Sequence, residues 1–170
     1  QEAGTAVVPV SLQIEPPLRV VAITGPNTGG KTVTLKSLGL ATLMARTGLF
    51  LPCSGTPQLP WCEAVLADIG DEQSLQQNLS TFSGHVKRIG RILGALQQGP
   101  APALVLLDEV GAGTDPSEGA ALATALLRHL ADQVQLSVAT THFGELKALK
   151  YDDSRFENAS VEFDEVSLRP

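Results

Sequence analysis

A chain of 170 residues, of which 43% are hydrophobic, is long enough to form one domain with a sizeable core. Its net charge of -6 argues against an extended nucleic-acid-binding face on this chain alone. No run is apolar enough to span a membrane and no leader precedes the first strand, so we expect a cytoplasmic protein without a membrane partner.

The first third of the chain reads as two strands and a helix. Residues 5–12 are rich in β-branched side chains but include Pro9, which predicts an edge strand. Residues 19–24 are almost continuously apolar, as in a buried parallel strand. Apolar residues then recur at helical spacing over 31–46, and Gly48 can end that helix.

A glycine-rich loop joins this strand to this helix, and it reads Gly25-Pro26-Asn27-Thr28-Gly29-Gly30-Lys31-Thr32. Strand, glycine-rich turn and helix form the context of a phosphate-binding loop. Glycines let backbone N–H groups turn toward phosphate oxygens, and the helix directs its positive end at the same anion. Lys31 can reach the β- and γ-phosphates, and the Thr32 hydroxyl can ligate Mg²⁺. The loop therefore predicts binding of a nucleoside triphosphate.

The middle of the chain alternates loop, strand and helix. Residues 51–61 contain three prolines and a glycine, which indicate a loop, and 64–69 read as a short strand. Ser80 or Thr81 can cap a helix that continues to about residue 97. A basic cluster on that helix includes Arg88 and is more typical of a solvated face than of a DNA site.

Two acids follow the next strand. Residues 103–107 are wholly apolar, and Asp108 and Glu109 come directly after them. Beside a phosphate-binding loop, Asp108 can hold the hydration shell of Mg²⁺ while Glu109 meets the attacking water. The alternative is a strand that simply ends in polar residues at the surface. A second acid at this place is typical of enzymes that activate water for hydrolysis.

The last third predicts a helix over 116–132, with Pro116 in its first turn, and a strand over 136–141. A short helix over 144–149 and a final strand over 159–163 follow. His142 comes directly after the strand 136–141. A lone histidine is more often structural, but at a strand end its neutral imidazole could hydrogen-bond the γ-phosphate or the attacking water.

Strands alternating with helices predict a three-layer α/β domain with a mostly parallel sheet and an antiparallel edge. The carboxyl ends of parallel strands meet at one edge of such a sheet. We therefore expect the glycine-rich loop, Asp108, Glu109 and His142 to converge on one site for a nucleoside triphosphate.

These motifs resemble those of the ATP-binding-cassette ATPases and, more closely, those of the MutS family of DNA mismatch-repair ATPases. The Gly-Pro-Asn start of the loop, the segments 68–74 and 79–85, the segment 107–116 and the Thr-Thr-His of 140–142 are similar to MutS motifs. The resemblance covers residues 5–165. It implies a P-loop NTPase fold of the ABC-ATPase type, Mg²⁺-dependent ATP hydrolysis, and a catalytic set of Lys31, Glu109 and His142.

Within that family the chain most resembles the second bacterial MutS paralogue, through the Ser-Thr-Phe-Ser-Gly-His form of residues 80–85, the segment 68–73 and the ending 157–163. This resemblance implies a larger protein with a nuclease domain, which acts on branched or mismatched DNA to suppress recombination. The alternative partner that it implies is the stalled ribosome. Residues 1–170 would be one ATPase domain, incomplete at its C-terminus.

The resemblance also implies a homodimer with composite ATP sites, in which Ser80 and Thr81 of one subunit complete the site of the other. An ordinary helix cap is the simpler interpretation of these two residues, and the two roles are compatible. Two other function classes stay open. One is an ATP-dependent clamp that hydrolyses slowly, and the other is a transporter cassette, although the Leu-Ser-Gly-Gly-Gln signature of transporters is absent.

Overall fold

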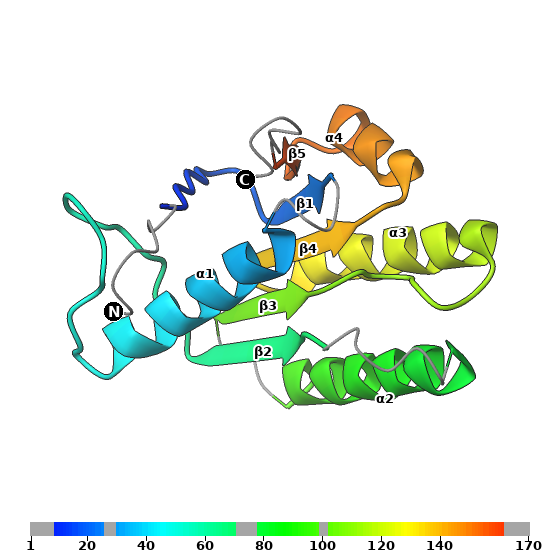
Figure 1. The fold of residues 1–170 in the computed structure, drawn as a ribbon, viewed down its shortest axis with the longest axis horizontal. Coiled ribbons are helices and arrows are strands. Elements are labelled where there is room, and N and C mark those ends of the chain that lie inside the picture. The colour runs from blue at the N-terminus through cyan, green and yellow to red at the C-terminus, as the bar shows by residue number, and fades with distance from the viewer. Residues whose placement is uncertain (1–8, 26–29, 71–77, 99–101, 162–170) are drawn as a thin grey trace, which may run out of the picture.

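The computed structural model describes residues 9–25, 30–70, 78–98 and 102–161, with the backbone alone for residues 78–81. Its centre is a five-stranded sheet of order β2-β3-β4-β1-β5, and every strand pair is parallel (Figure 1). The strands are β1 (Val20–Thr24), β2 (Ala64–Asp68), β3 (Ala103–Leu107), β4 (Leu136–Thr141) and β5 (Phe156–Ser160).

Helices follow the strands along the chain. They are α1 (Lys31–Arg46), α2 (Asn78–Leu96), α3 (Pro116–Gln133), the 3-10 helix η2 (Gly144–Ala148) and α4 (Leu149–Asp152). Asp115 caps α3, since its side chain accepts hydrogen bonds from the backbone N–H groups of Ser117 and Glu118. No helix in the described part of the chain is long and apolar enough to cross a membrane.

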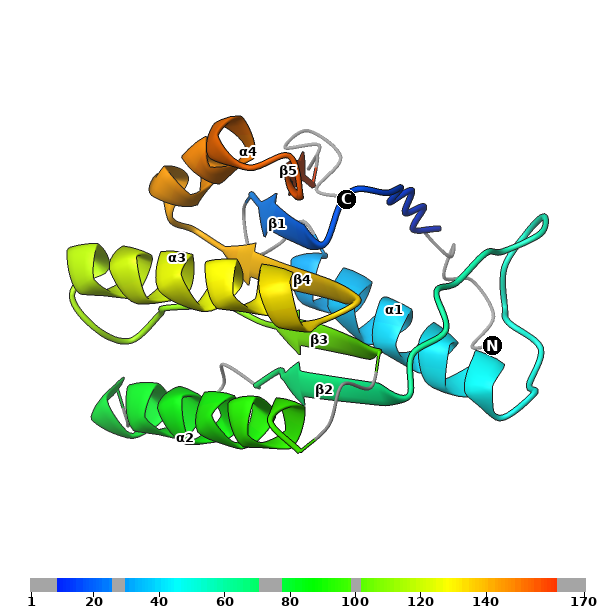
Figure 2. The ribbon, with the colours of Figure 1, turned by 180° about the vertical axis from the view of Figure 1, so that it is seen from behind.

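The sheet is covered on both faces, which makes three layers. Helix α1 packs on one face, while α2 and α3 lie side by side on the other (Figure 2). Strand β3 is uniformly apolar because both of its faces are buried. Leu104 and Leu106 belong to the core cluster that contains α1, and Val105 and Leu107 belong to the cluster that contains α3. A strand buried on both faces cannot alternate apolar and polar residues.

The α/β class and the order of elements are confirmed, but several boundaries differ from the sequence prediction. The predicted antiparallel edge is absent from the described residues, because residues 9–12 form no strand and every described pair is parallel. Residues 5–8 lie outside the described part. The predicted strand over 159–163 is displaced, since β5 begins at Phe156, where its backbone pairs with Val20.

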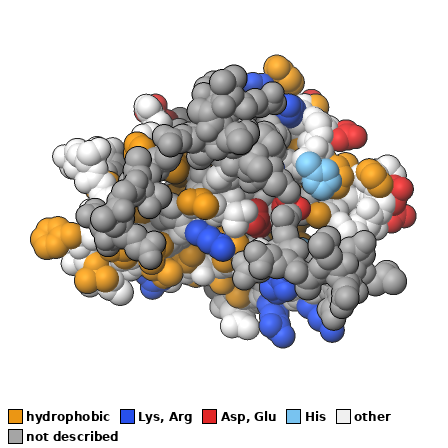
Figure 3. All heavy atoms as spheres, in the orientation of Figure 1, with side chains coloured by type: hydrophobic (Ala, Val, Ile, Leu, Met, Phe, Trp, Pro, Cys, Tyr) orange, Lys and Arg blue, Asp and Glu red, His pale blue; other side chains and the backbone are white. Residues whose placement is uncertain are grey.

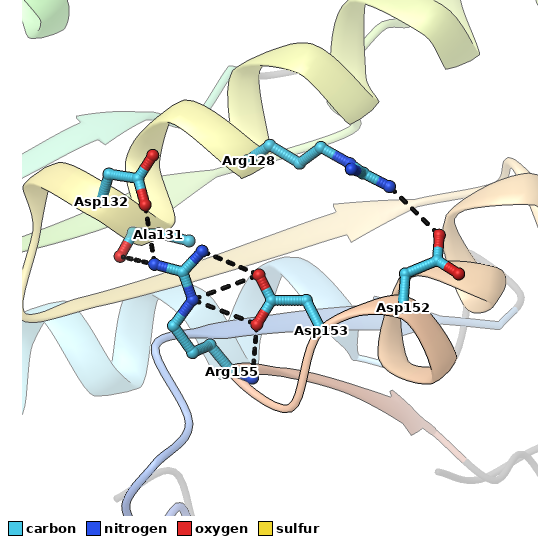
Figure 4. Close-up of polar contacts among 6 residues, drawn as sticks. All are labelled: Arg128, Ala131, Asp132, Asp152, Asp153 and Arg155. Carbon is cyan, nitrogen blue, oxygen red and sulfur yellow. Dashed lines mark hydrogen bonds and ion pairs between the residues drawn. The ribbon is translucent and has the colours of Figure 1, made fainter.

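An ion-pair cluster joins the end of α3 to the start of β5. The guanidinium of Arg155 donates to Asp153, to Asp132 and to the backbone oxygen of Ala131 (Figure 4). Hydrogen bonds from the side chain and backbone of Arg155 lower the pKa of Asp153 from 3.8 to about 2. The neighbouring pair of Arg128 and Asp152 is more exposed, with 54% and 61% of the two side chains accessible.

This cluster predicts an acid-dependent loss of stability. Because the folded pKa of Asp153 is depressed, its contribution is present above pH 4 and is lost as the pH falls toward about 2. Asp153→Asn should lower the melting temperature by roughly 3 °C at pH 7, and the difference from the unmodified chain should vanish near the folded pKa. Thermal unfolding followed by circular dichroism checks this. Asp152→Asn is the matched control, and its effect should be smaller at every pH.

Candidate functional site

The polar residues singled out in the sequence follow three neighbouring strands. Gly25 follows β1, Asp108 follows β3 and His142 follows β4, and these strands are adjacent in the order β3-β4-β1. All three strands are parallel, so their carboxyl ends share one edge of the sheet (Figure 1). The predicted convergence of these residues on one edge is therefore confirmed. On the face of the molecule drawn in Figure 3, acidic side chains near the centre lie close to a histidine.

Two of the loop glycines have backbone conformations that favour glycine. Gly25 has φ 136° and Gly30 has φ 79°. At Gly25 space is also short, because an added Cβ would lie 3.2 Å from the backbone oxygen of Val161 and 3.0 Å from its side chain. Pro26, Asn27, Thr28 and Gly29 lie outside the described residues.

Helix α1 begins directly after this loop. Gly30 is its N-cap residue, and among the described residues no side chain caps the helix and no acid lies in its first turn. The backbone oxygen of Gly30 accepts hydrogen bonds from the N–H and the hydroxyl of Thr34, which fixes the start of the helix. A helix start of this kind attracts anions through its backbone N–H groups and its dipole.

Lys31 lies in the first turn of α1 and is only 3% exposed. Its ammonium group donates to the backbone oxygen of Gly25 at the other end of the loop. The side chain thus curves back over the loop instead of extending into solvent. This position suits a phosphate-binding lysine, because a buried ammonium is favoured by a neighbouring anion.

The Asp108 carboxylate links the end of the glycine-rich loop to strand β4. Its two oxygens accept hydrogen bonds from Thr32 Oγ1 at 2.8 Å and from Thr140 Oγ1 at 2.5 Å. The side chain is buried, as the residue is 6% exposed. Thr32 and Asp108 were predicted to share a Mg²⁺ site, and the direct hydrogen bond brings their oxygens together. The metal itself stays a prediction.

Thr140 is a site residue that the sequence reasoning missed. Besides donating to Asp108, its hydroxyl accepts the backbone N–H of Glu109 at 2.8 Å, and its backbone oxygen accepts the N–H of Val110. It is fully buried in β4. The sequence shows a hydroxyl residue near the end of the strand. The contacts of that hydroxyl with Asp108 and Glu109 require β4 to lie beside β3, and no sequence motif indicates this pairing.

Glu109 has a strained backbone. Its φ of 49° makes it the one described residue other than glycine in the left-handed region, a conformation that costs about 1 kcal/mol. The hydrogen bond to Thr140 holds it there. Among the described residues nothing donates to its carboxylate, which leaves that group available as a proton acceptor.

His142 is exposed at the end of β4, whereas the next residue, Phe143, is buried. Their ring centroids are 4.2 Å apart. Phe143 packs where the loop after Glu109 meets α3, since a Cβ on either Gly111 or Gly119 would lie 2.9 Å from its ring. This anchor places the histidine at the site edge. No hydrogen bond from its ring to Asp108 or Glu109 occurs among the described residues, so its phosphate-sensing role stays a prediction.

Ser80 and Thr81 do not precede α2 as the predicted cap. The helix begins at Asn78, so both residues lie within its first turns. The start of α2 also extends beyond the carboxyl ends of the strands and away from the start of α1 (Figures 1 and 2). The structure therefore does not bring Ser80 and Thr81 to the glycine-rich loop of their own chain. Their side chains lie outside the described set.

Comparisons with known proteins agree with the resemblance noted in the sequence. A model of the family MutS domain V matches residues 21–169. The chain is 65% identical to the Endonuclease MutS2 of Synechocystis sp., an alignment that covers 100% of this chain and 22% of that protein. It is 57% identical to the Endonuclease MutS2 of Symbiobacterium thermophilum, over 96% of this chain and 20% of that one. The chain thus spans about a fifth of the length of these relatives.

Proposed function

Because the chain belongs to the MutS domain V family, we propose that it is the ATP-binding and ATP-hydrolysing domain of a longer MutS-like protein. Its fold would then be a P-loop NTPase of the ABC-ATPase type. The observation that carries the proposal is the hydrogen bond from Thr32 to Asp108. It joins a glycine-rich loop to an acid on a separate strand, as a magnesium–nucleotide site requires. The choice of ATP over GTP follows the family resemblance.

The residues present fit Mg²⁺ bound together with a nucleotide. Mg²⁺ prefers hard oxygen ligands and binds through one or two carboxylates and the substrate phosphates, without a full protein cage. Thr32 and Asp108 offer a hydroxyl and a carboxylate already within 2.8 Å of each other. Among the described residues, no group of three or more His, Cys, Asp or Glu side chains is arranged to hold a metal ion by itself. When bound, the ion neutralises charge on the transferred phosphoryl group.

Residues of the chain itself bind the phosphates, accept the proton of the water and contact the γ-phosphate. Lys31 and the N–H groups at the start of α1 bind and orient the phosphates. Glu109 accepts the proton of the attacking water, and the hydrogen bond from its backbone N–H to Thr140 holds the backbone that carries this carboxylate. His142 donates a hydrogen bond to the γ-phosphate, and Phe143 fixes the direction of approach.

The position of α2 supports a composite site. Because its first turns lie away from the loop of the same chain, Ser80 and Thr81 are better placed to serve a second copy. Mixing a Ser80→Ala/Thr81→Ala double variant with Lys31→Ala tests this in full-length protein. Each variant alone should be inactive, and the mixture should recover hydrolysis through one intact site per heterodimer. A mixture as inactive as its parents would remove the role in trans.

For the whole protein we propose that ATP turnover is coupled to branched or mismatched DNA. The support is the similarity to proteins named Endonuclease MutS2, and the nuclease would lie outside this chain. Phosphate release by the full-length protein, measured with four-way DNA junctions, linear duplex and collided ribosomes, tests the proposal. Junctions should raise the rate several-fold above linear duplex. Stimulation by ribosomes alone would replace DNA with the ribosome as partner.

A further inference from the structure

A buried carboxylate outside the proposed ATP site connects α2 to the sheet. Asp68 ends β2 and is 2% exposed. Its carboxylate accepts hydrogen bonds from His85 Nδ1 at 2.7 Å and from Arg88 Nε, both on α2. Burial alone raises the pKa of Asp68, but the hydrogen bonds from His85 and Arg88 outweigh burial and leave the pKa below its usual value. The group is therefore a buried anion held by two donors.

The geometry also defines the roles of the two α2 residues. An ionised carboxylate can only accept hydrogen bonds, so the Nδ1 atom of His85 carries a hydrogen and donates a hydrogen bond to Asp68. Arg88 uses its Nε for the same carboxylate, and its guanidinium lies under Gly84, where an added Cβ would be 3.4 Å from Nη1. Arg88 was grouped with a solvated basic face in the sequence, but it is the inward member of that group.

The same aspartate contacts the proposed ATP site through its backbone. The N–H of Asp108 donates to the backbone oxygen of Asp68 at 2.8 Å. Asp68 thus contacts α2 through its side chain, and it contacts Asp108 at the end of β3 through its backbone oxygen. A second contact also joins α2 to the proposed ATP site. Gly113, in the loop after Glu109, packs closely on Phe82 of α2.

The N-terminal half of α2 depends on these contacts. Among the side chains of α2 that the structure describes, the apolar ones that pack on the core are Ile89, Ile92, Leu93 and Leu96, all in the C-terminal half of the helix. Val86, in the other half, is 43% exposed. Among the described side chains, those that tie this half of the helix to the sheet and to the loop after Glu109 are therefore the Asp68 cluster and Phe82.

We propose that Asp68, with His85 and Arg88, is a positioning cluster that fixes the first turns of α2 relative to Asp108 and Glu109. This proposal rests on the proposed ATPase function and names residues with no contact to the nucleotide. The cluster sets where one subunit presents Ser80 and Thr81 to the ATP site of the other. Its loss impairs hydrolysis at the partner's site and leaves the affinity for ATP in its own loop unchanged.

Hydrogen exchange of the full-length protein tests the anchoring without any measurement of activity. Arg88→Gln removes one donor while keeping a polar side chain of similar reach, and Asp68→Ala removes the acceptor. Both should speed exchange of the amides of residues 82–88 by roughly tenfold, with residues 89–96 unchanged. Arg91→Gln is the matched control, the same substitution on an exposed residue of the same helix. Equal exchange in Arg88→Gln and Arg91→Gln would overturn the proposal.

Turnover separates positioning from a general loss of stability. Arg88→Gln should lower kcat by roughly tenfold and leave the Kd of a fluorescent ATP analogue within about twofold. Heterodimers of Arg88→Gln with Glu109→Gln, purified through two affinity tags, should recover about half of the unmodified turnover. In these heterodimers an unimpaired α2 from the Glu109→Gln subunit faces an intact Glu109. No recovery would show that Arg88 acts on its own site, and the proposal would be wrong.

Different results would contradict the ATPase function and the positioning role of the cluster. If the unmodified protein releases no phosphate, the proposed function is wrong, and the exchange of residues 82–88 still decides whether the cluster holds α2. If the unmodified protein is active and Arg88→Gln matches it in kcat, the ATPase function stands and the positioning role is overturned.

Discussion

Replacing Glu109 with glutamine is expected to lower ATP turnover by about two to four orders of magnitude while ATP binding is retained. The amide has the size of the carboxylate but cannot accept the proton of the attacking water. The backbone at this position has φ 49° and is held by Thr140, so the substitution changes chemistry at a fixed place. Asp108, Thr32 and Lys31, which contact the loop or one another, are left intact.

Phosphate release at saturating ATP measures the effect, and equilibrium titration with a fluorescent ATP analogue measures the binding. Glu63→Gln is the matched control, because Glu63 is exposed and directly precedes β2 at the opposite edge of the sheet. Its turnover should equal that of the unmodified protein. If the Glu109→Gln protein hydrolyses ATP at a similar rate, Glu109 does not activate the water.

The second large effect is expected from Lys31→Ala, which should weaken ATP binding by roughly 10- to 100-fold. Lys31 is buried, and its ammonium group is held over the loop by Gly25. The substitution removes the positive charge from the place where the β- and γ-phosphates would bind. The defect should therefore appear in Kd itself, unlike the defect of Glu109→Gln.

Titration with the same fluorescent analogue checks this expectation, with Lys147→Ala as control. Lys147 lies in η2, is exposed, and is one of the basic residues near the same edge of the sheet. Loss of a surface charge there should change Kd less than twofold. Unchanged affinity in Lys31→Ala would mean that the glycine-rich loop does not bind the triphosphate.

Much of this site was predictable from the sequence because its parts are local. A glycine-rich loop between strand and helix, and two acids after an apolar strand, can each be recognised in a short window. Their convergence follows from the rule that parallel strands share a carboxyl edge, and the structure confirms it. Strand β3 was likewise predicted from its continuous apolar run, and the strand predicted over 136–141 is β4.

What the sequence could not predict depends on which strands are neighbours. The Thr140 hydroxyl can hydrogen-bond both the Asp108 carboxylate and the Glu109 backbone only because β4 lies between β3 and β1. Arg88 seemed solvated, because nothing local places the end of β2 beneath α2. The start of α2 was misplaced for a simpler reason. Serine and threonine favour N-caps, but they are also tolerated in the first turn of a helix.

If the loop and the two acids form a Mg²⁺-dependent ATPase site, the purified full-length protein should release phosphate from ATP. Release should saturate with ATP, stop when EDTA removes Mg²⁺, and fall to background in Glu109→Gln. Phosphate release no greater than that of Glu109→Gln, at any ATP concentration and with DNA junctions or ribosomes present, would contradict the proposed ATPase function.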